Sequence, residues 1–146
     1  MVKIYVAQES DMPRVLAMGM VFMATRPFGS THGGAPDRLT AAIKICLTTG
    51  VVLLAAESGK VFGMLCIYTI EHPLTGELCA EELAWWVDPE HKSLLAGPKL
   101  LRAGIVWARQ IGVECLKMSA LAETRVGLFL EHQGFVKAET SYVLRF

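Results

Sequence analysis

The sequence predicts an α+β fold in which helices flank a mixed β-sheet. Apolar segments of strand length, alternating or continuous, cluster in the middle of the chain. Segments with helical apolar spacing lie before and after them, and Gly- and Pro-containing turns separate the elements. The predicted order is strand, helix, helix, three strands, helix, strand, helix, strand. Neither repeats nor a linker interrupt this order, so we expect one domain over residues 1–146.

The first part of the chain predicts one strand and two helices. Ser and Asp are good N-caps, Pro fits a first helical turn, and Gly commonly follows a helix C-terminus. The expected elements are a strand at 3–8, a helix capped by Ser10 or Asp11, a Gly-rich loop at 26–34 and a helix from Pro36 to Gly50.

The remaining elements follow from the same signals. Ser58-Gly59 is a compact hairpin turn between two apolar runs. The expected elements are strands at 51–57, 60–70 and 77–87, a helix from Ala96 or Gly97 to Gly112, a strand at 113–121, a helix at 123–133 and a last strand at 139–146. We therefore expect an antiparallel meander followed by a strand-helix-strand unit with parallel strands.

Composition excludes several function classes. The 146 residues are 53% hydrophobic and 19% charged, with 14 acidic and 14 basic groups, which argues against disorder and against a basic nucleic-acid surface. Trp85 and Trp86 are adjacent in a strand, so we expect at most one to line a cleft. The mean hydropathy of +0.41 is high and favours a homodimer interface.

The sequence also bears on location and on metal binding. Its apolar runs are far shorter than the about 20 residues that a membrane helix needs, and the N-terminus lacks a signal layout, so we expect a cytoplasmic protein without membrane contact. Because His32, His72 and His91 are scattered along the chain, we expect no metal site. Four widely spaced cysteines are expected to be buried free thiols: Cys46, Cys66, Cys79 and Cys115.

The stretch DPEHKSLLAGPKLLRAG (88–104) predicts an anion site. The first amides of a helix have no partner within the helix, and the helix dipole adds positive charge there, which suits a pyrophosphate. Gly97 allows close approach to the backbone, and Lys92 and Lys99 flank the same point. An ordinary strand-to-helix turn is the alternative.

VDPEHKSLLAGPKLL resembles the acetyl-coenzyme A loop of the GNAT acetyltransferase superfamily, commonly written VDPxYRGxGxGxxLL. EHQGFVKAETSYV is similar to the family's YEKLGF segment and its last strand. The resemblance spans nearly the whole chain and is closest to short acetyltransferase-like proteins carried by tailed phages. It implies a three-layer GNAT-like fold, with a mixed central sheet flanked by helices, and acetyl-coenzyme A as co-substrate.

The resemblance also implies the cofactor site. Val87 takes the position whose backbone meets the pantetheine arm, and Lys92 that of the leading basic residue. Leu95 replaces the central loop glycine. Because Leu does not readily adopt a positive φ, we expect the loop to turn another way or the pyrophosphate to lie farther out. The implied cofactor-binding residues are Val87, Lys92, Leu95, Ala96, Gly97 and Lys99.

Acetyl transfer to an amine needs a base, because an amine with a pKa of about 10.4 is protonated at neutral pH. The resemblance aligns Glu81 with the family's general base. Glu82 points to the opposite face and takes that role if a bulge shifts the register. Two polar residues entering a strand are the alternative reading.

The family's general acid is a Tyr whose position Leu130 occupies here. His132 and Tyr142 are possible substitutes, although capping and packing are their commoner roles. Losing a general acid slows such an enzyme without abolishing it, because positioning contributes more to the rate.

The resemblance places the acceptor pocket at the loop after the first helix, where Arg26, Phe28 and His32 are the candidate substrate-binding residues. Protein N-termini, lysines, aminoglycosides, polyamines and small metabolites all remain open as amine acceptors. We expect an N-acetyltransferase. The alternative, which Leu95 and Leu130 favour, is a binding or structural module, such as a phage protein, that keeps the fold without the chemistry.

Overall fold

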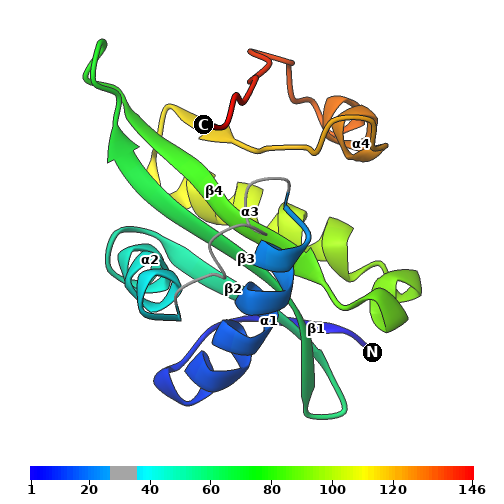
Figure 1. Cartoon of the computed structure of the whole chain (residues 1–146). Coiled ribbons are helices and arrows are strands. Elements are labelled where there is room, and N and C mark those ends of the chain that lie inside the picture. Colours follow the sequence, from blue (N-terminus) through cyan, green and yellow to red (C-terminus); the bar gives the residue numbers. More distant parts are fainter. Residues whose placement is uncertain (27–35) are drawn as a thin grey trace.

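A mixed five-stranded sheet organises the molecule (Figure 1). The computed structural model describes residues 1–26 and 36–146, without the side chains of residues 92–94. The elements are β1 (Lys3–Val6), η1 (Glu9–Asp11), α1 (Met12–Ala24), α2 (Pro36–Thr49), β2 (Val51–Glu57), β3 (Lys60–Glu71), β4 (Leu78–Val87), η2 (Pro89–Leu94), α3 (Ala96–Ile111), β5 (Cys115–Lys117) and α4 (Val126–His132).

The strands lie in the order in which they occur along the chain. β1 to β4 form an antiparallel meander, and β5 then pairs with β4 in parallel after the crossover through α3. Ser58 and Gly59, both with positive φ, form the tight turn between β2 and β3. The predicted α+β class, the meander and the parallel pair are confirmed.

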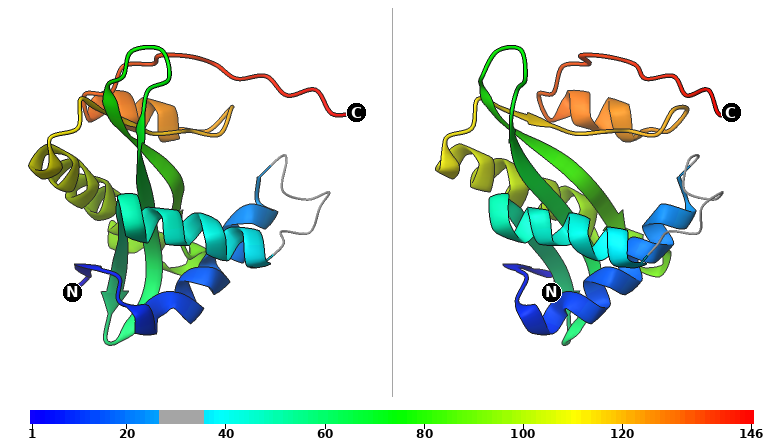
Figure 2. Two further views of the ribbon diagram at one scale, coloured as in Figure 1. Left: turned by 90° about the vertical axis from the view of Figure 1, so that its left-hand side faces the viewer. Right: turned by 60° about the vertical axis from the view of Figure 1, so that its left-hand side comes forward.

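Helices cover the two faces of the sheet, which gives three layers (Figure 2). Met18 of α1 and Ile43 of α2 belong to a buried cluster on one face, and Leu100 of α3 belongs to a cluster on the other. A Cβ added at Gly104 would stand 2.8 Å from the Leu65 side chain, so this glycine lets α3 pack closely on the sheet. Successive residues of a strand point to opposite faces of the sheet. Because helices cover both faces here, β2 and the middle of β3 are continuously apolar.

Two expectations for the C-terminal part are wrong. Residues 139–146 form no strand, and Tyr142 in this tail is 91% exposed. β5 has three residues instead of the nine expected at 113–121. A segment with alternating residues forms a strand only where a neighbouring strand provides backbone hydrogen-bond partners. β5, with its three residues, provides very few such partners for the tail. Figure 2 shows α4 and the extended tail along the β5 edge of the sheet.

One expectation for the cysteines is also wrong. Cys46, Cys66 and Cys79 are buried free thiols as expected, whereas Cys115 is exposed because it begins the short edge strand β5. In the described part of the chain, no helix is long and apolar enough to cross a membrane.

Candidate active site

A cleft opens where β4 and β5 part. Their last paired residues are Glu81 and Lys117, while β4 continues to Val87. Just beyond this pair, the backbone N–H of Ser119 donates a hydrogen bond of 2.8 Å to a carboxylate oxygen of Glu82. The cleft has a volume of about 420 Å³ and reaches from the N-terminus of α3 to the end of α1. Parallel strands that separate in this way leave one edge of β4 open to a ligand.

A β-bulge in β4 decides which side chains face this cleft. The register with β3 passes from Ile67↔Glu82 to Cys66↔Ala84, which leaves Leu83 as the extra residue. Glu82 follows Ala80 on the α3 face, and after the bulge Trp85 and Val87 pack on that same face. The bulge thus aligns Glu82 with the two following residues of the cleft wall.

Glu82 is held in an environment that disfavours its charge. Burial raises the pKa of Glu82, although the hydrogen bond from the Ser119 amide and the positive charge of Arg26 oppose the rise. Arg26 lies with its guanidinium carbon 4.1 Å from the centre of the Phe22 ring, and burial lowers the pKa of Arg26. The cleft therefore contains one half-buried carboxylate with an elevated proton affinity.

Glu81 lies on the other face of β4. Its carboxylate accepts a hydrogen bond of 2.7 Å from the Tyr68 hydroxyl and forms an ion pair of 3.4 Å with Lys117. Burial, with the Glu81 hydrogen bond second, raises the pKa of Tyr68 to about 12. Nearby Glu81 raises the pKa of Lys117. Glu81 is thus part of a polar cluster that links β3, β4 and β5, and it does not line the cleft.

The N-terminus of α3 forms the other end of the cleft. Leu95 caps this helix with φ 57° and ψ 23°, in the left-handed region, and its side chain is 63% exposed. The expectation that Leu95 would make the loop turn another way is wrong: Leu95 adopts the left-handed conformation, at a local steric cost of about 1–2 kcal/mol between its Cβ and the backbone. The helix itself supplies no acceptor for its first amides, which begin at Ala96.

Gly97 stands against the cleft wall. A Cβ added to Gly97 would lie 3.7 Å from the Trp85 ring and 3.9 Å from Val87, so the space beside its backbone is narrow but open. Within the described part of the chain, the buried indole Nε1 of Trp85 has no hydrogen-bond partner. A narrow groove, free helix-end amides and an unsatisfied donor suit an elongated anion with polar groups along its length.

The structure brings together some of the predicted site residues and separates others. Glu82, Arg26, Val87 and Gly97 line the cleft. Ala96 is buried beneath it, and Leu95 is exposed at its rim. Lys99 lies on another side of α3, where it lines a second cavity between β1 and α3. Lys92 is in η2, and its side chain is not among those that the structure describes. Phe28 and His32 lie outside the described residues.

The profile of the acetyltransferase (GNAT) family matches residues 20–135, which includes the C-terminal end of α1, all of α2, the sheet from β2 onward and α4. The chain belongs to this family. Its class of activity is therefore N-acetyl transfer, and the expectation drawn from the loop motif is confirmed. Among curated proteins, none matches the sequence.

Solved structures agree with the GNAT fold. A putative acetyl transferase from Pyrococcus furiosus superposes with a TM-score of 0.80 at 15% identity, covering 99% of each chain. Ribosomal-protein-alanine N-acetyltransferase from Brucella melitensis biovar Abortus 2308 has a TM-score of 0.74 at 19% identity, covering 99% of each chain. AAC(6')-Iy in complex with the bisubstrate analogue CoA-S-monomethyl-acetylneamine has a TM-score of 0.77 at 13% identity, with 100% of this chain and 98% of that chain covered. These likenesses establish the three-layer fold.

Both tryptophans of this GNAT chain border the cleft, which corrects the expectation of at most one. Trp85 packs on the α3 face and lies 6.2 Å from the Phe129 ring of α4, whereas Trp86 packs on the opposite face. They face opposite ways as expected, but the cleft lies at the edge of the sheet and reaches both faces.

Arg14 is a residue that the sequence did not single out. Its Nε donates a hydrogen bond of 2.8 Å to the Val61 carbonyl, and its guanidinium pairs with Asp88, directly after β4. The indole of Trp86 donates to the other oxygen of Asp88 at 3.0 Å. Arg14 and Asp88 are 74 positions apart, so no local pattern could predict the contact. These bonds fix the turn that leads from β4 toward α3.

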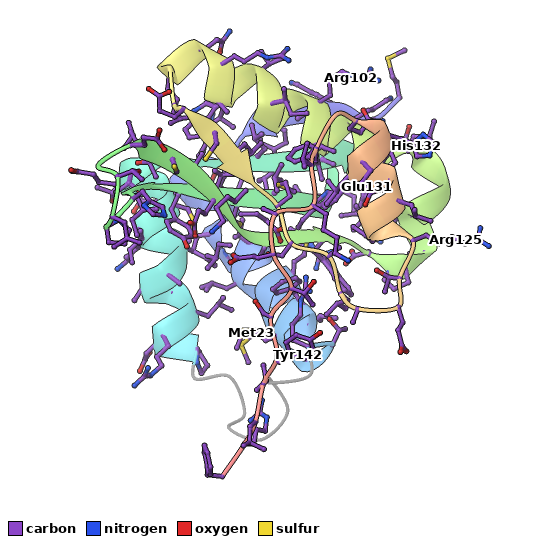
Figure 3. The ribbon with its side chains drawn as sticks, turned by 90° about the horizontal axis from the view of Figure 1, so that it is seen from above. Met23, Arg102, Arg125, Glu131, His132 and Tyr142 are labelled. Carbon is purple, nitrogen blue, oxygen red and sulfur yellow. The ribbon has the colours of Figure 1, made fainter. Side chains whose placement is uncertain are left out.

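Neither candidate general acid lies in the cleft of this GNAT protein. His132 ends α4 and is exposed, Tyr142 is in the exposed tail, and Leu130 is buried. Figure 3 shows Glu131 and His132 on α4, with Tyr142 in the tail well away from that helix. Among the described residues, the groups suited to the chemistry are therefore those that line the cleft.

Proposed function

We propose that this protein transfers an acetyl group from acetyl-coenzyme A to a primary amine by direct attack, with Glu82 as the general base. The observation that carries the proposal is the half-buried Glu82 carboxylate, whose pKa is raised, in the wall of the cleft between β4 and β5. A carboxylate with elevated proton affinity is a better base near neutral pH than an ordinary one. Glu81 lacks this position, because its carboxylate is paired outside the cleft.

The cleft residues fit acetyl-coenzyme A. The pyrophosphate would meet the first amides of α3 beside Gly97, where the helix dipole favours negative charge. The pantetheine arm is an extended amide chain, and the open edge of β4 near Val87 offers backbone groups to such a chain. The unsatisfied Trp85 indole N–H is a further donor toward this groove. The complex of AAC(6')-Iy with a CoA bisubstrate analogue supports a coenzyme A ligand in this fold.

Acetyl-coenzyme A supplies an acetyl thioester when it is bound. Glu82 accepts a proton from the incoming ammonium group, so that the amine nitrogen can form a bond to the carbonyl carbon. The carbon–sulfur bond breaks, and the electron pair leaves with the sulfur as a thiolate. The nitrogen then loses its second proton, which the thiolate accepts, so the products are the amide, the free thiol and protonated Glu82. Because a thiol has an ordinary pKa of about 8.5, the thiolate is stable enough to leave without a side-chain acid. This explains how the chain can function with Leu130 in place of the family's Tyr.

The charges of the cleft favour an acceptor with a single amine. Among the described lining residues, Arg26 and Glu82 are the charged ones, one of each sign. Residues 27–35, PFGSTHGGA, contain no acidic residue either. A polycation needs several carboxylates, whereas a peptide N-terminus or a small monoamine needs one, with Arg26 available for a carbonyl or carboxylate of the acceptor.

An acetylation assay tests the proposal. The purified protein is given acetyl-coenzyme A with a panel of peptides that differ at the N-terminus, monoamines, polyamines and an aminoglycoside, and free thiol release is followed. We expect turnover with peptides or monoamines, and its loss in Glu82→Gln. Calorimetry with acetyl-coenzyme A separates the alternative of a non-catalytic module, which would bind the cofactor without turnover or not bind it at all.

Four further expectations stay predictions. They are a cytoplasmic location, a homodimer, the absence of nucleic-acid and membrane partners, and the likeness to phage proteins.

A further inference from the structure

Two cysteines meet outside the cleft just described. Cys79 of β4 and Cys115 of β5 are register partners in the parallel pair. Register partners project from the same face of a sheet, and neighbouring strands lie about 4.8 Å apart. This separation falls within the range of Cα distances that a disulfide spans, about 4.4 to 6.8 Å. The register pairing therefore meets the Cα-distance requirement for a disulfide.

The two thiols differ in access. Cys79 is 4% exposed, whereas Cys115 is exposed at the start of the edge strand. The hydrogen bond between the two sulfurs, with burial second, raises the pKa of Cys79 to about 11. Cys79 thus keeps its proton at neutral pH. Cys115 is the thiol that a small reagent in solution can reach.

We propose that Cys79 and Cys115 form a redox-active pair that closes into an intramolecular disulfide by exchange with a small disulfide such as glutathione disulfide. The Cys115 thiolate attacks one sulfur of glutathione disulfide, forms a mixed disulfide and releases one glutathione thiolate. The Cys79 sulfur then attacks the Cys115 sulfur, its proton passes to the departing thiolate, and a second glutathione leaves. The two cysteines are oxidised by two electrons, and glutathione disulfide is reduced to two thiols.

The pair lies in the paired part of β4 and β5, two positions before the residues at which the strands part to form the cleft. β5 is joined to β4 by three register pairs and by the hydrogen bond from the Glu114 amide to the Leu78 carbonyl. The segment after β5 carries Ser119, which contacts Glu82. A disulfide between Cys79 and Cys115 would pin this short strand, and with it one wall of the cleft, to the rest of the sheet.

The other two cysteines are suited to be internal controls. Cys46 and Cys66 are buried within the core on the α1 and α2 face. Burial raises the pKa of Cys46 to about 12 and raises that of Cys66 as well. Neither thiol should react while the protein is folded.

The test is oxidation of the folded full-length protein with glutathione disulfide, followed by intact-mass measurement and peptide mapping. We expect the wild type to lose the mass of two hydrogen atoms, to show a Cys79–Cys115 crosslink that dithiothreitol reverses, and to melt at a higher temperature when oxidised. Cys79→Ala should stop at one glutathione on Cys115. Cys115→Ser, a surface change that leaves the buried thiols in place, should not react.

Three results would overturn the proposal. They are a stable glutathione adduct on wild-type Cys115, no reaction of the wild type, and a crosslink between other cysteines. If Cys79→Ala perturbs folding, Cys46 and Cys66 will become reactive toward a thiol reagent. In that case the comparison of wild type with Cys115→Ser tests the proposal, because this variant should not react with glutathione disulfide. The readout is independent of acetyl transfer, so a failed activity assay leaves it intact.

Discussion

The Glu82 carboxylate accepts a hydrogen bond of 2.8 Å from the Ser119 amide and so bridges β4 and β5 where the two strands part. The contact fixes the orientation of a half-buried carboxylate in a cleft where Arg26 is the other charged residue among the described lining residues. It uses a backbone donor, so substitution of the Ser119 side chain would preserve it. Glu82 is therefore both a structural link across the cleft and the group best placed to receive a proton there.

We expect Glu82→Gln to lower kcat by about 10²- to 10⁴-fold, the usual contribution of a general base. The amide oxygen of Gln can still accept the Ser119 hydrogen bond, so cofactor affinity should change little. The measurement is steady-state kinetics combined with calorimetry. Glu81→Gln is the matched control, because Glu81 lies on the opposite face, and its kcat should stay close to that of the wild type. Comparable losses in both variants would remove Glu82 from the mechanism.

We expect Leu95→Gly to stabilise the protein by about 0.5–1 kcal/mol. A left-handed conformation costs a non-glycine residue about 1–2 kcal/mol, and Gly removes this cost. Gly also has more freedom in the unfolded chain, which lowers the free energy of unfolding by about 0.5–1 kcal/mol. The Leu95 side chain is 63% exposed, so its loss removes little burial. Urea denaturation measures the effect. Leu95→Ala keeps a Cβ at the same φ and should leave stability nearly unchanged; an equal gain in both variants would contradict the strain argument.

Gly97→Ala separates a structural from a functional role. Ala favours helix over Gly by up to about 1 kcal/mol, and the new methyl group meets Trp85 and Val87 without a clash, so stability should rise. The same methyl group occupies the groove proposed for the cofactor, so acetyl-coenzyme A should bind about tenfold more weakly, a loss of about 1.4 kcal/mol. Thermal melting and calorimetry give the two quantities. Arg102→Ala, an exposed change on the same helix, should affect binding little. Unchanged affinity in Gly97→Ala would mean that the groove is elsewhere.

Arg14→Met should loosen the turn after β4 while keeping much of the apolar stem. We expect a loss of about 1–2 kcal/mol in unfolding free energy, because the hydrogen bond to Val61 and the pair with the less exposed Asp88 are both removed. The KM for acetyl-coenzyme A should rise more than kcat falls, since the turn leads to α3 and not to Glu82. The exposed Arg38→Met on α2 is the control. A fall in kcat at constant KM would show that Arg14 acts on the chemistry.

The sequence predicted the helices and most strands because apolar periodicity and turn residues act locally. It could not choose between Glu81 and Glu82, because simple alternation groups Glu81 with Trp85 and Val87, and only the bulge at Leu83 brings Glu82 to their face. It predicted a strand at 139–146 from alternation, but pairing depends on the length of the β5 edge, which is a tertiary property. Leu95 departs from the motif in the sequence, yet the backbone keeps the conformation that the motif requires.

The raised pKa of Glu82 also predicts a pH-dependent stability difference. In the folded state Glu82 holds its proton to a higher pH than the ordinary value of about 4.3 for an unfolded Glu. Below that value both states are protonated, and the residue costs nothing. As the pH rises from there to the folded pKa, the unfolded state loses its proton first, so stability falls, and above the folded pKa the cost is constant. The pKa of Glu82 is raised even with Arg26 nearby, so the charged form of Glu82 destabilises the folded state. Glu82→Gln should therefore melt above the wild type at pH 7, and the difference should shrink toward zero near pH 4. In the wild type, kcat/KM should rise through the same pH window. A difference in melting temperature that is independent of pH would show that the pKa of Glu82 is not raised in the folded state.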